Sequence, residues 1–250
     1  MSVTLLIEQL LNGVQLGTML FLMASGLTLV FGVMGLINLA HGSFYMVGAY
    51  ATAAVTASTG SFLIGLAAGM TAAALVGALV ELLVIRRLYH RPHLDQVLAT
   101  FALILIFSEG TRWLFGSSPL WLSPPSWLTG FVTLPGDTRY PIYRLMLIGV
   151  GVAIAIGLYL LISRTRLGMR IRAGESDREM IGALGVNIAK LYTVVFALGA
   201  ALAGLAGALV GALQSVQVGM GEPVLILAFV VIVIGGIGSI KGALFGALLV

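Results

Sequence analysis

The most constraining feature of this sequence is a run of 72 residues, from Gln9 to Val80, that contains no Asp, Glu, Lys or Arg. About 20 consecutive apolar residues cross the core of a bilayer as a helix, so this run has room for two or three crossings. Over the whole chain, 60% of the residues are hydrophobic and 9% are charged. Since so few charged side chains cannot cover the surface of a soluble domain, we predict an all-α polytopic membrane protein. A soluble enzyme, a disordered chain and a secreted module are excluded.

Apolar runs separated by polar or glycine-rich breaks predict about seven transmembrane segments in a single membrane domain over residues 1–250. They are expected at residues 5–31, 35–57, 62–85, 96–115, 143–162, 191–213 and 224–240. A connector at residues 117–141 holds five of the seven prolines and two of the three tryptophans. Because tryptophan prefers the membrane–water boundary, we expect this connector to lie at the membrane surface.

The distribution of positive charge predicts the orientation of the chain. The loops at residues 86–95 and 163–190 carry nine of the thirteen Lys and Arg residues. Alternating segments place both loops on one side of the membrane, and excess positive charge marks the cytoplasmic side. The connector and the amino terminus are then expected outside. After Lys241 nine residues remain, too few to span a bilayer as a helix; we expect either half of a broken helix or a sequence truncated within its next segment.

Glycine makes up 33 of the 250 residues and recurs four residues apart on the expected helices. Such rows let helix backbones approach closely inside a membrane, and most of them are expected to serve packing alone. Pairs of this kind occur at Gly13 and Gly17, Gly65 and Gly69, and Gly207 and Gly211. Glu109 and Arg112, three residues apart, are expected to form a local ion pair near the outer surface.

Two glycine-rich clusters predict breaks in helices within the membrane. One, at residues 35–42, contains Asn38, His41 and Gly42, and the other, at residues 235–242, contains Gly235, Gly236, Gly238 and Ser239. Irregular backbone at membrane depth must be buried in protein or line a watery cavity. These seven residues are therefore candidates for lining a translocation path, although Asn38 and His41 equally fit polar groups that a neighbouring helix satisfies or that lie at the cytoplasmic membrane boundary. The 200-residue offset between the clusters hints at an internal repeat.

The sequence shows no catalytic constellation, and we expect neither a cofactor nor a metal. It has no cysteine. The glycines at 235–242 do not complete a dinucleotide-binding or phosphate-binding pattern, because Lys241 stands in place of the third glycine and Ile240 precedes that lysine. Net positive charge is explained by membrane orientation, so no nucleic-acid partner is expected.

The loop at residues 163–190 predicts a short helix that docks on a partner or on its own bundle. Ser176 and Glu179 have the spacing of a capping box, Met180, Ile181 and Leu184 form a narrow apolar stripe, and Gly185 suits a helix end. The expected helix has about eight residues, so it needs a surface to dock on.

Three motifs in this order resemble the permeases of branched-chain amino acid ABC importers, in particular the smaller of the two paired permeases. They are the residues 38–42 (NLAHG), the pattern RAGE at 172–175 with ALGVN at 183–187, and residues 234–242 (IGGIGSIKG). The resemblance covers residues 13–250. Members of the family usually continue beyond this point into at least one further segment.

The resemblance implies a non-enzymatic subunit of the bacterial inner membrane. Its partners would be a second homologous permease, two ATPase subunits and an extracytoplasmic solute-binding protein. The loop at 163–190 would meet the ATPase through these residues: Arg172, Ala173, Glu175, Ser176, Glu179, Met180, Ile181, Leu184 and Gly185. The substrate would be a branched-chain or related amino acid. A stand-alone channel or a secondary transporter for a small polar solute is the alternative; a secondary transporter usually buries an ionisable residue at mid-membrane, and the first 80 residues offer only His41.

Overall fold

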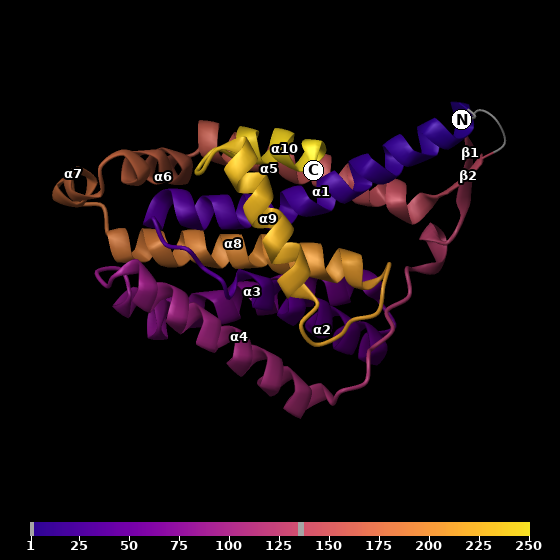
Figure 1. Cartoon of the computed structure of the whole chain (residues 1–250), viewed down its shortest axis with the longest axis horizontal. Helices are drawn as coiled ribbons and strands as arrows, with labels where there is room; N and C mark the ends of the chain where they lie inside the picture. Colours follow the sequence, from indigo (N-terminus) through magenta and orange to yellow (C-terminus); the bar gives the residue numbers. More distant parts are fainter. Residues whose placement is uncertain (1–2, 135–137) are drawn as a thin grey trace.

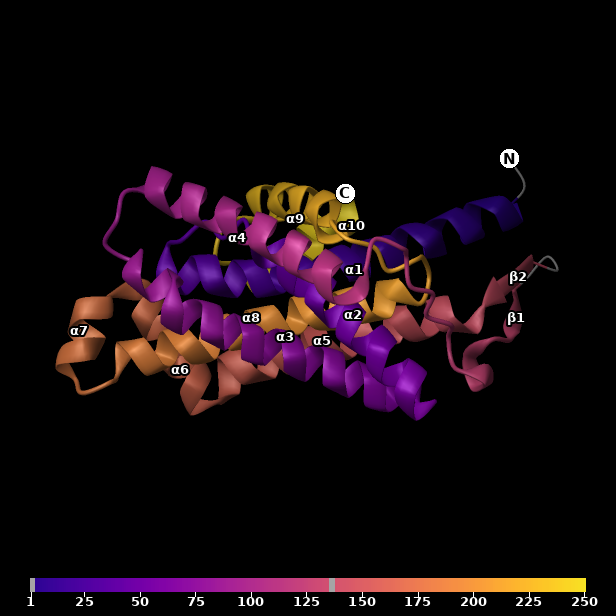
Figure 2. The same cartoon turned by 90° about the horizontal axis from the view of Figure 1, so that it is seen from below.

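The computed structural model describes residues 3–134 and 138–250, and in this part the chain is a bundle of α-helices (Figures 1 and 2). The long helices are α1 (Val3–Met34), α3 (Phe62–Leu83), α4 (His93–Phe115), α5 (Ile142–Arg164) and α8 (Ile188–Gly211). The shorter helices are α2 (His41–Thr59), α6 (Arg166–Ser176), α7 (Arg178–Ala183), α9 (Gly221–Gly235) and α10 (Ile240–Leu249). Two 3₁₀ turns, η1 (Ile85–Arg87) and η2 (Ser126–Leu128), and the antiparallel strands β1 (Phe131–Leu134) and β2 (Thr138–Pro141) complete the described elements.

Among the described residues, five helices are long and apolar enough to cross a membrane, or six if the bent pair α9 and α10 counts as one span. The predicted number of about seven was therefore too high. The apolar run expected at residues 35–57 begins as a helix only at His41, and the resulting helix α2 is not among the helices long and apolar enough to cross a membrane. The segment expected at 224–240 ends early at Gly235, where the chain turns by 115° into α10.

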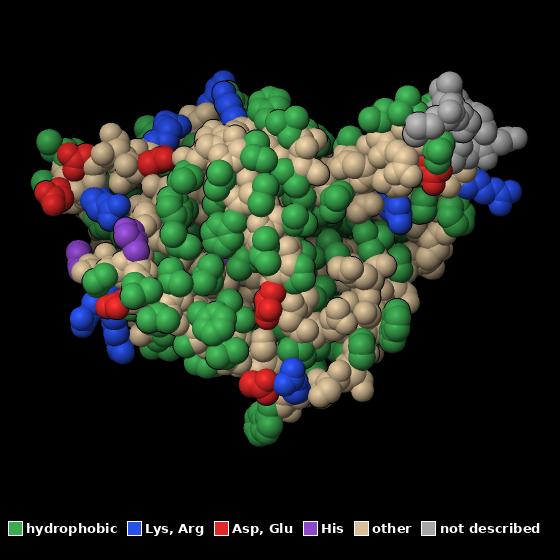
Figure 3. Space-filling view, in the orientation of Figure 1, with side chains coloured by type: hydrophobic (Ala, Val, Ile, Leu, Met, Phe, Trp, Pro, Cys, Tyr) green, Lys and Arg blue, Asp and Glu red, His purple; other side chains and the backbone are tan. Residues whose placement is uncertain are grey.

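The polar segments gather at the two ends of the bundle (Figure 1). The helices α6 and α7 and the turn between α3 and α4 lie at one end, which we call the coupling end. The start of α1, the strands and the described part of the connector at 117–141 lie at the other, the connector end. Figure 3 shows charged side chains concentrated at these ends and a mainly hydrophobic surface between them. As the alternation of segments predicted, the loops at 86–95 and 163–190 share one end.

The centre of the bundle is formed by α1, α2, α3 and α8, which pack through small residues. A Cβ on Gly48 would lie 2.3 Å from the Cα of Gly204, and one on Gly77 would lie 2.4 Å from the Cβ of Ala200. Glycine is thus what lets α2, α3 and α8 approach to backbone contact, as the four-residue spacing predicted. In the most apolar stretch of each spanning helix, the buried share is 83% in α1 and 72% in α8, whereas it is 17% in both α4 and α5. The helices α4 and α5 therefore lie at the periphery.

Two helices begin near half the height of the bundle rather than at one of its two ends. The chain leaves α1 at the coupling end, runs back without helical structure through residues 35–40, and starts α2 at His41. After α8, residues 212–220 return in the same way from the connector end before α9 starts at Gly221. The two starting points meet, since the carbonyl oxygen of Gly42 lies where a Cβ on Gly221 would have to be. Both α2 and α9 are thus partial spans, which is how irregular backbone reaches membrane depth inside protein.

Candidate translocation path and coupling surface

The first glycine-rich break is buried inside the bundle. The side chains of Asn38 and His41 are 0% exposed, and Gly42 is buried as well. The Asn38 Oδ1 atom accepts a hydrogen bond from the Ala40 amide at 3.1 Å, which closes the turn that precedes α2. The His41 ring packs edge-on against Phe44 at 6.0 Å. Gly35, with a φ of +64°, ends α1 in the left-handed conformation that glycine adopts without strain.

The second break forms the sharp turn between α9 and α10. Gly236 and Gly238 have φ values of +89° and +82°. The Ser239 hydroxyl accepts a hydrogen bond from the Gly242 amide at 3.0 Å and caps α10. Gly235 packs backbone to backbone on Gly242, which allows the two helices to fold against each other.

The structure does not bring the two predicted clusters together. They lie at opposite ends of α9: its start meets Gly42, and the turn after it meets Gly32 near the end of α1 through Gly238. Gly238 and Ser239 border a groove of about 870 Å³ between α1, α5, α6 and α10. The described cavities are lined by other residues than Asn38, His41 and Gly42.

The loop at 163–190 contains two helices where the sequence predicted one. The first, α6, was not foreseen; the second, α7, has six residues rather than about eight. The predicted capping box is wrong, because Asp177 caps α7: its Oδ1 atom accepts from the amides of Glu179 at 3.0 Å and Met180 at 2.9 Å. Ser176 instead ends α6. Asp177 caps the helix in place of Ser176 because its carboxylate reaches the free amides of Glu179 and Met180 in the first turn.

The apolar residues of α7, and Leu184 directly after it, divide between the bundle and the surface. Ile181 is 6% exposed, whereas Met180 and Leu184 are 59% and 76% exposed. Gly185 ends this segment with a φ of +85°, as predicted. The other residues expected at this surface, Arg172, Ala173, Glu175, Ser176 and Glu179, are all exposed. A short helix anchored by one buried side chain therefore presents two large apolar side chains outward.

The first of these helices, α6, contacts the second glycine-rich break. A carboxylate oxygen of Glu175 lies 2.5 Å from where a Cβ on Gly238 would be, and 3.3 Å from the corresponding position on Gly32. A Cβ at Gly238 would therefore displace this side chain. The coupling loop and the turn between α9 and α10 are thus in direct contact.

A buried ionic cluster that the sequence analysis missed ties α3 to the start of α8. Glu81 is 0% exposed and forms an ion pair with Arg86 at 3.0 Å. The same carboxylate accepts hydrogen bonds from Tyr89 at 2.6 Å and Thr193 at 2.8 Å. Burial and the hydrogen bond to Glu81 raise the pKa of the Tyr89 phenol. The spacing of Glu81 and Arg86 at the end of an apolar run was the available signal, but Thr193 comes close only through the packing of α3 on α8.

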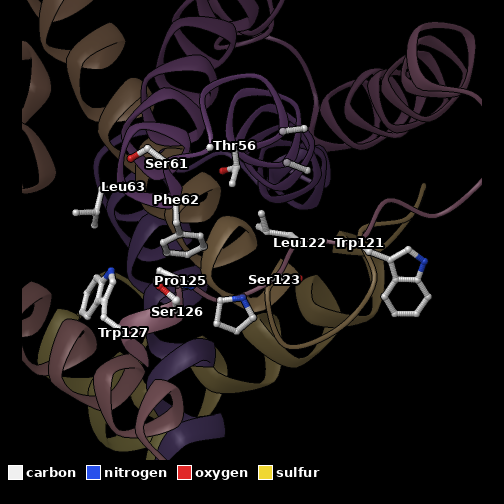
Figure 4. A pocket seen from close by; sticks show the side chains of 14 residues that line it. Thr56, Ser61, Phe62, Leu63, Trp121, Leu122, Ser123, Pro125, Ser126 and Trp127 are labelled. Carbon is white, nitrogen blue, oxygen red and sulfur yellow. The ribbon is translucent and has the colours of Figure 1, made fainter. Parts of the chain in front are cut away.

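At the connector end, a cavity of about 480 Å³ lies between the turn from α2 to α3 and residues 121–127 (Figure 4). The ring of Phe62 lies at its centre, with Trp127 on one side and Leu122 on the other (Figure 4). Hydroxyl groups of Ser61, Ser123 and Ser126 border it as well. Trp121 and Trp127 are 82% and 62% exposed, which agrees with a place at the membrane surface.

Comparison with known proteins decides the family. The family described as branched-chain amino acid transport system, permease component, matches residues 9–250. The chain belongs to this family. It is 32% identical to the high-affinity branched-chain amino acid transport system permease protein BraD of Pseudomonas aeruginosa, over 97% of this chain and 83% of that protein. It is 31% identical, with the same coverage, to the permease protein LivH of the corresponding system of Escherichia coli.

Membership of this permease family agrees with the three sequence motifs and with the apolar helices. The chain is a multi-pass membrane protein and a permease component of an ABC transport system. A probable branched-chain amino acid transport permease of Methanocaldococcus jannaschii is 28% identical over 93% of this chain and 75% of that protein. No solved structure matches the chain.

Proposed function

We propose that this chain is one of two homologous permease subunits of an ATP-driven importer in the bacterial inner membrane. Two ATPase subunits bind at the coupling end, and an extracytoplasmic solute-binding protein delivers the substrate at the connector end. The observation that carries this proposal is α7, where Met180 and Leu184 are exposed beside the buried Ile181. Exposed apolar side chains on a short, anchored helix suit a groove on a partner protein.

The orientation in this proposal follows the positive charge. Nine of the thirteen Lys and Arg residues lie in the loops at 86–95 and 163–190, both at the coupling end. Excess Lys and Arg marks the cytoplasmic side, so the coupling end faces the cytoplasm and the start of α1 faces outward.

The substrate is a branched-chain amino acid or a related amino acid, as the names of the relatives suggest. The two glycine-rich breaks, with Asn38, His41 and Gly42 in one and Gly235, Gly236, Gly238 and Ser239 in the other, are where the helices rearrange along the path. Glu175 supports this role for the second break, because its carboxylate contacts both Gly238 and α1. Movement of the coupling loop by the ATPases would reach this turn directly.

Reconstitution tests the proposal. Vesicles that contain the second permease, both ATPases and the binding protein should accumulate a branched-chain amino acid when ATP is supplied, and vesicles with this chain alone should not. Uptake by the single chain would instead support the channel or secondary transporter.

The docking surface is tested by co-purification of the ATPase. Leu184→Asp places a charge on the exposed stripe of α7 and should abolish co-purification while the membrane bundle stays folded. Leu94→Asp is the matched control, since Leu94 is also apolar, 68% exposed and at the coupling end. ATPase retained by Leu184→Asp, or lost equally with both variants, would show that α7 is not the docking helix.

A further inference from the structure

The side chain of Glu222 is an exposed carboxylate in the first turn of α9. Within the described residues the ion pairs are Glu81 with Arg86 and Glu109 with Arg112, so Glu222 has no basic partner there. The partial positive charge at the start of a helix favours an acidic side chain in this position. That effect explains why α9 tolerates Glu222, but it leaves both carboxylate oxygens free to accept hydrogen bonds.

The depth of Glu222 follows from a chain of contacts through two glycine pairs and the ring of His41. The neighbouring Gly221 packs on Gly42, at the start of α2. The adjacent His41 places its Nε2 atom 3.0 Å from where a Cβ on Gly26 would be, and Gly26 packs on Gly199. Gly199 is the twelfth of the 24 residues of α8. Glu222 therefore lies near half the height of a spanning helix, far from both ends of the bundle.

An exposed, unpaired carboxylate at this depth is incompatible with a face that contacts lipid tails. Charged side chains at mid-membrane are costly and occur where they face a watery cavity or a partner. In Figure 3, charged side chains interrupt the hydrophobic surface over α4 and α9, away from the charged ends. The ion pair on α4 is neutral as a unit, because Arg112 binds Glu109 at 2.6 Å. Glu222 is different, since it takes part in neither ion pair of the described residues.

We propose that Glu222 lines the translocation path and binds the ammonium group of the amino acid as it passes. This assignment rests on the proposed function and names the residue that recognises the substrate class. It adds an exposed residue to the path beside the buried break: Asn38 and His41 are inside the bundle, whereas Glu222 stands at about the same depth on an exposed face. A carboxylate and an ammonium group form a charge-assisted hydrogen bond, which is the stronger kind.

The accessibility of a thiol at position 222 to a water-soluble reagent tests whether this position lines the path. Since the chain has no cysteine, Glu222→Cys carries its single thiol. In the assembled transporter, a membrane-impermeant cationic methanethiosulfonate should modify this thiol, read by mass on this chain. The control is Val152→Cys, near the middle of α5 and 53% exposed. A thiol in lipid stays protonated and unreactive, so we expect modification of Glu222→Cys to be faster by roughly tenfold or more. Equal rates, or no reaction at Glu222→Cys, would overturn the assignment.

Uptake tests the role of the charge. Glu222→Gln has nearly the same shape without the charge, and its maximal uptake rate should fall about tenfold to a hundredfold, the effect of losing one charged hydrogen bond. Glu222→Asp should recover part of the rate, and ATPase co-purification should be unchanged in both variants. If the wild-type complex takes up amino acids and Glu222→Gln does so equally well, the inference is wrong. If the wild-type complex takes up none, the proposed function itself fails.

Discussion

Gly221 packs directly on Gly42, so that the first turns of α9 and α2 touch backbone to backbone in the middle of the bundle. A Cβ on Gly221 would lie 1.9 Å from the Gly42 carbonyl oxygen, closer than any real contact. Because the obstructing atom belongs to the backbone, a side chain cannot move aside to make room. This contact sets the depth of Glu222 and joins the two partial spans.

Gly221→Ala should therefore destabilise the protein by about 1–3 kcal/mol or more, the usual effect of overpacking a tight site. The matched control is Gly157→Ala in α5, where a Cβ meets nothing within 4 Å. Thermal unfolding followed by fluorescence-detected size exclusion measures both variants in the same detergent. A melting temperature for Gly221→Ala equal to that of Gly157→Ala would contradict the contact.

The ionic cluster at Glu81 predicts a difference between two neighbouring arginines. Arg86→Ala leaves the fully buried Glu81 without its ion-pair partner, whereas Arg87 is exposed and makes no described ion pair. We expect Arg86→Ala to cost about 2 kcal/mol of stability, less than for a fully buried pair because the Arg86 side chain is 37% exposed. Arg87→Ala should change little. Comparable losses in the two variants would show that the cluster does not stabilise the fold.

The raised pKa of Tyr89 predicts that the contribution of this side chain to stability does not change with pH until a free phenol begins to ionise. Burial, and then its hydrogen bond to Glu81, raise the pKa of this phenol in the folded state above the unfolded value of about 10. The folded state favours the protonated phenol, so its stabilising effect is fully present below pH ~10 and is lost only as the pH rises through the folded pKa. The difference in melting temperature between wild type and Tyr89→Phe should stay constant from about pH 6 to pH 9. It should shrink as the pH rises above about 10, and a difference that stays constant there would contradict the raised pKa.

The hydrogen bonds at the start of α7 predict different effects for substitutions of the adjacent residues Ser176 and Asp177. Asp177→Ala removes the acceptor of two amide hydrogen bonds and should destabilise this helix by about 1 kcal/mol. Ser176→Ala should have no such effect, because Ser176 belongs to α6. Hydrogen exchange of the amides at residues 178–183 measures the local change. Faster exchange in Ser176→Ala than in Asp177→Ala would restore the capping box that the sequence suggested.

Several features of this protein were accessible from the sequence because they depend on local composition. Long uncharged runs predicted the spanning helices, and the alternation of these segments correctly placed the two basic loops at one end. The glycines at 35–42 and 235–242 predicted breaks, and Gly35, Gly236 and Gly238 indeed adopt positive φ values. The rows of small residues predicted close helix packing, which Gly48 and Gly204 confirm. The likeness of three motifs to one permease family was confirmed over residues 9–250.

Only the tertiary structure decided how deep each break lies and what stands beside it. In sequence, Glu222 is an acid in a short loop between two apolar runs; the contacts of Gly221 with Gly42 place it at mid-depth on an exposed face. Glu81 and Thr193 lie 112 positions apart and meet because α3 packs on α8. Hydropathy reports whether a segment prefers lipid or water, and it carries no information about the register between helices. That register depends on which backbones touch, and here it determines which polar side chains are buried in the bundle and which face its surface.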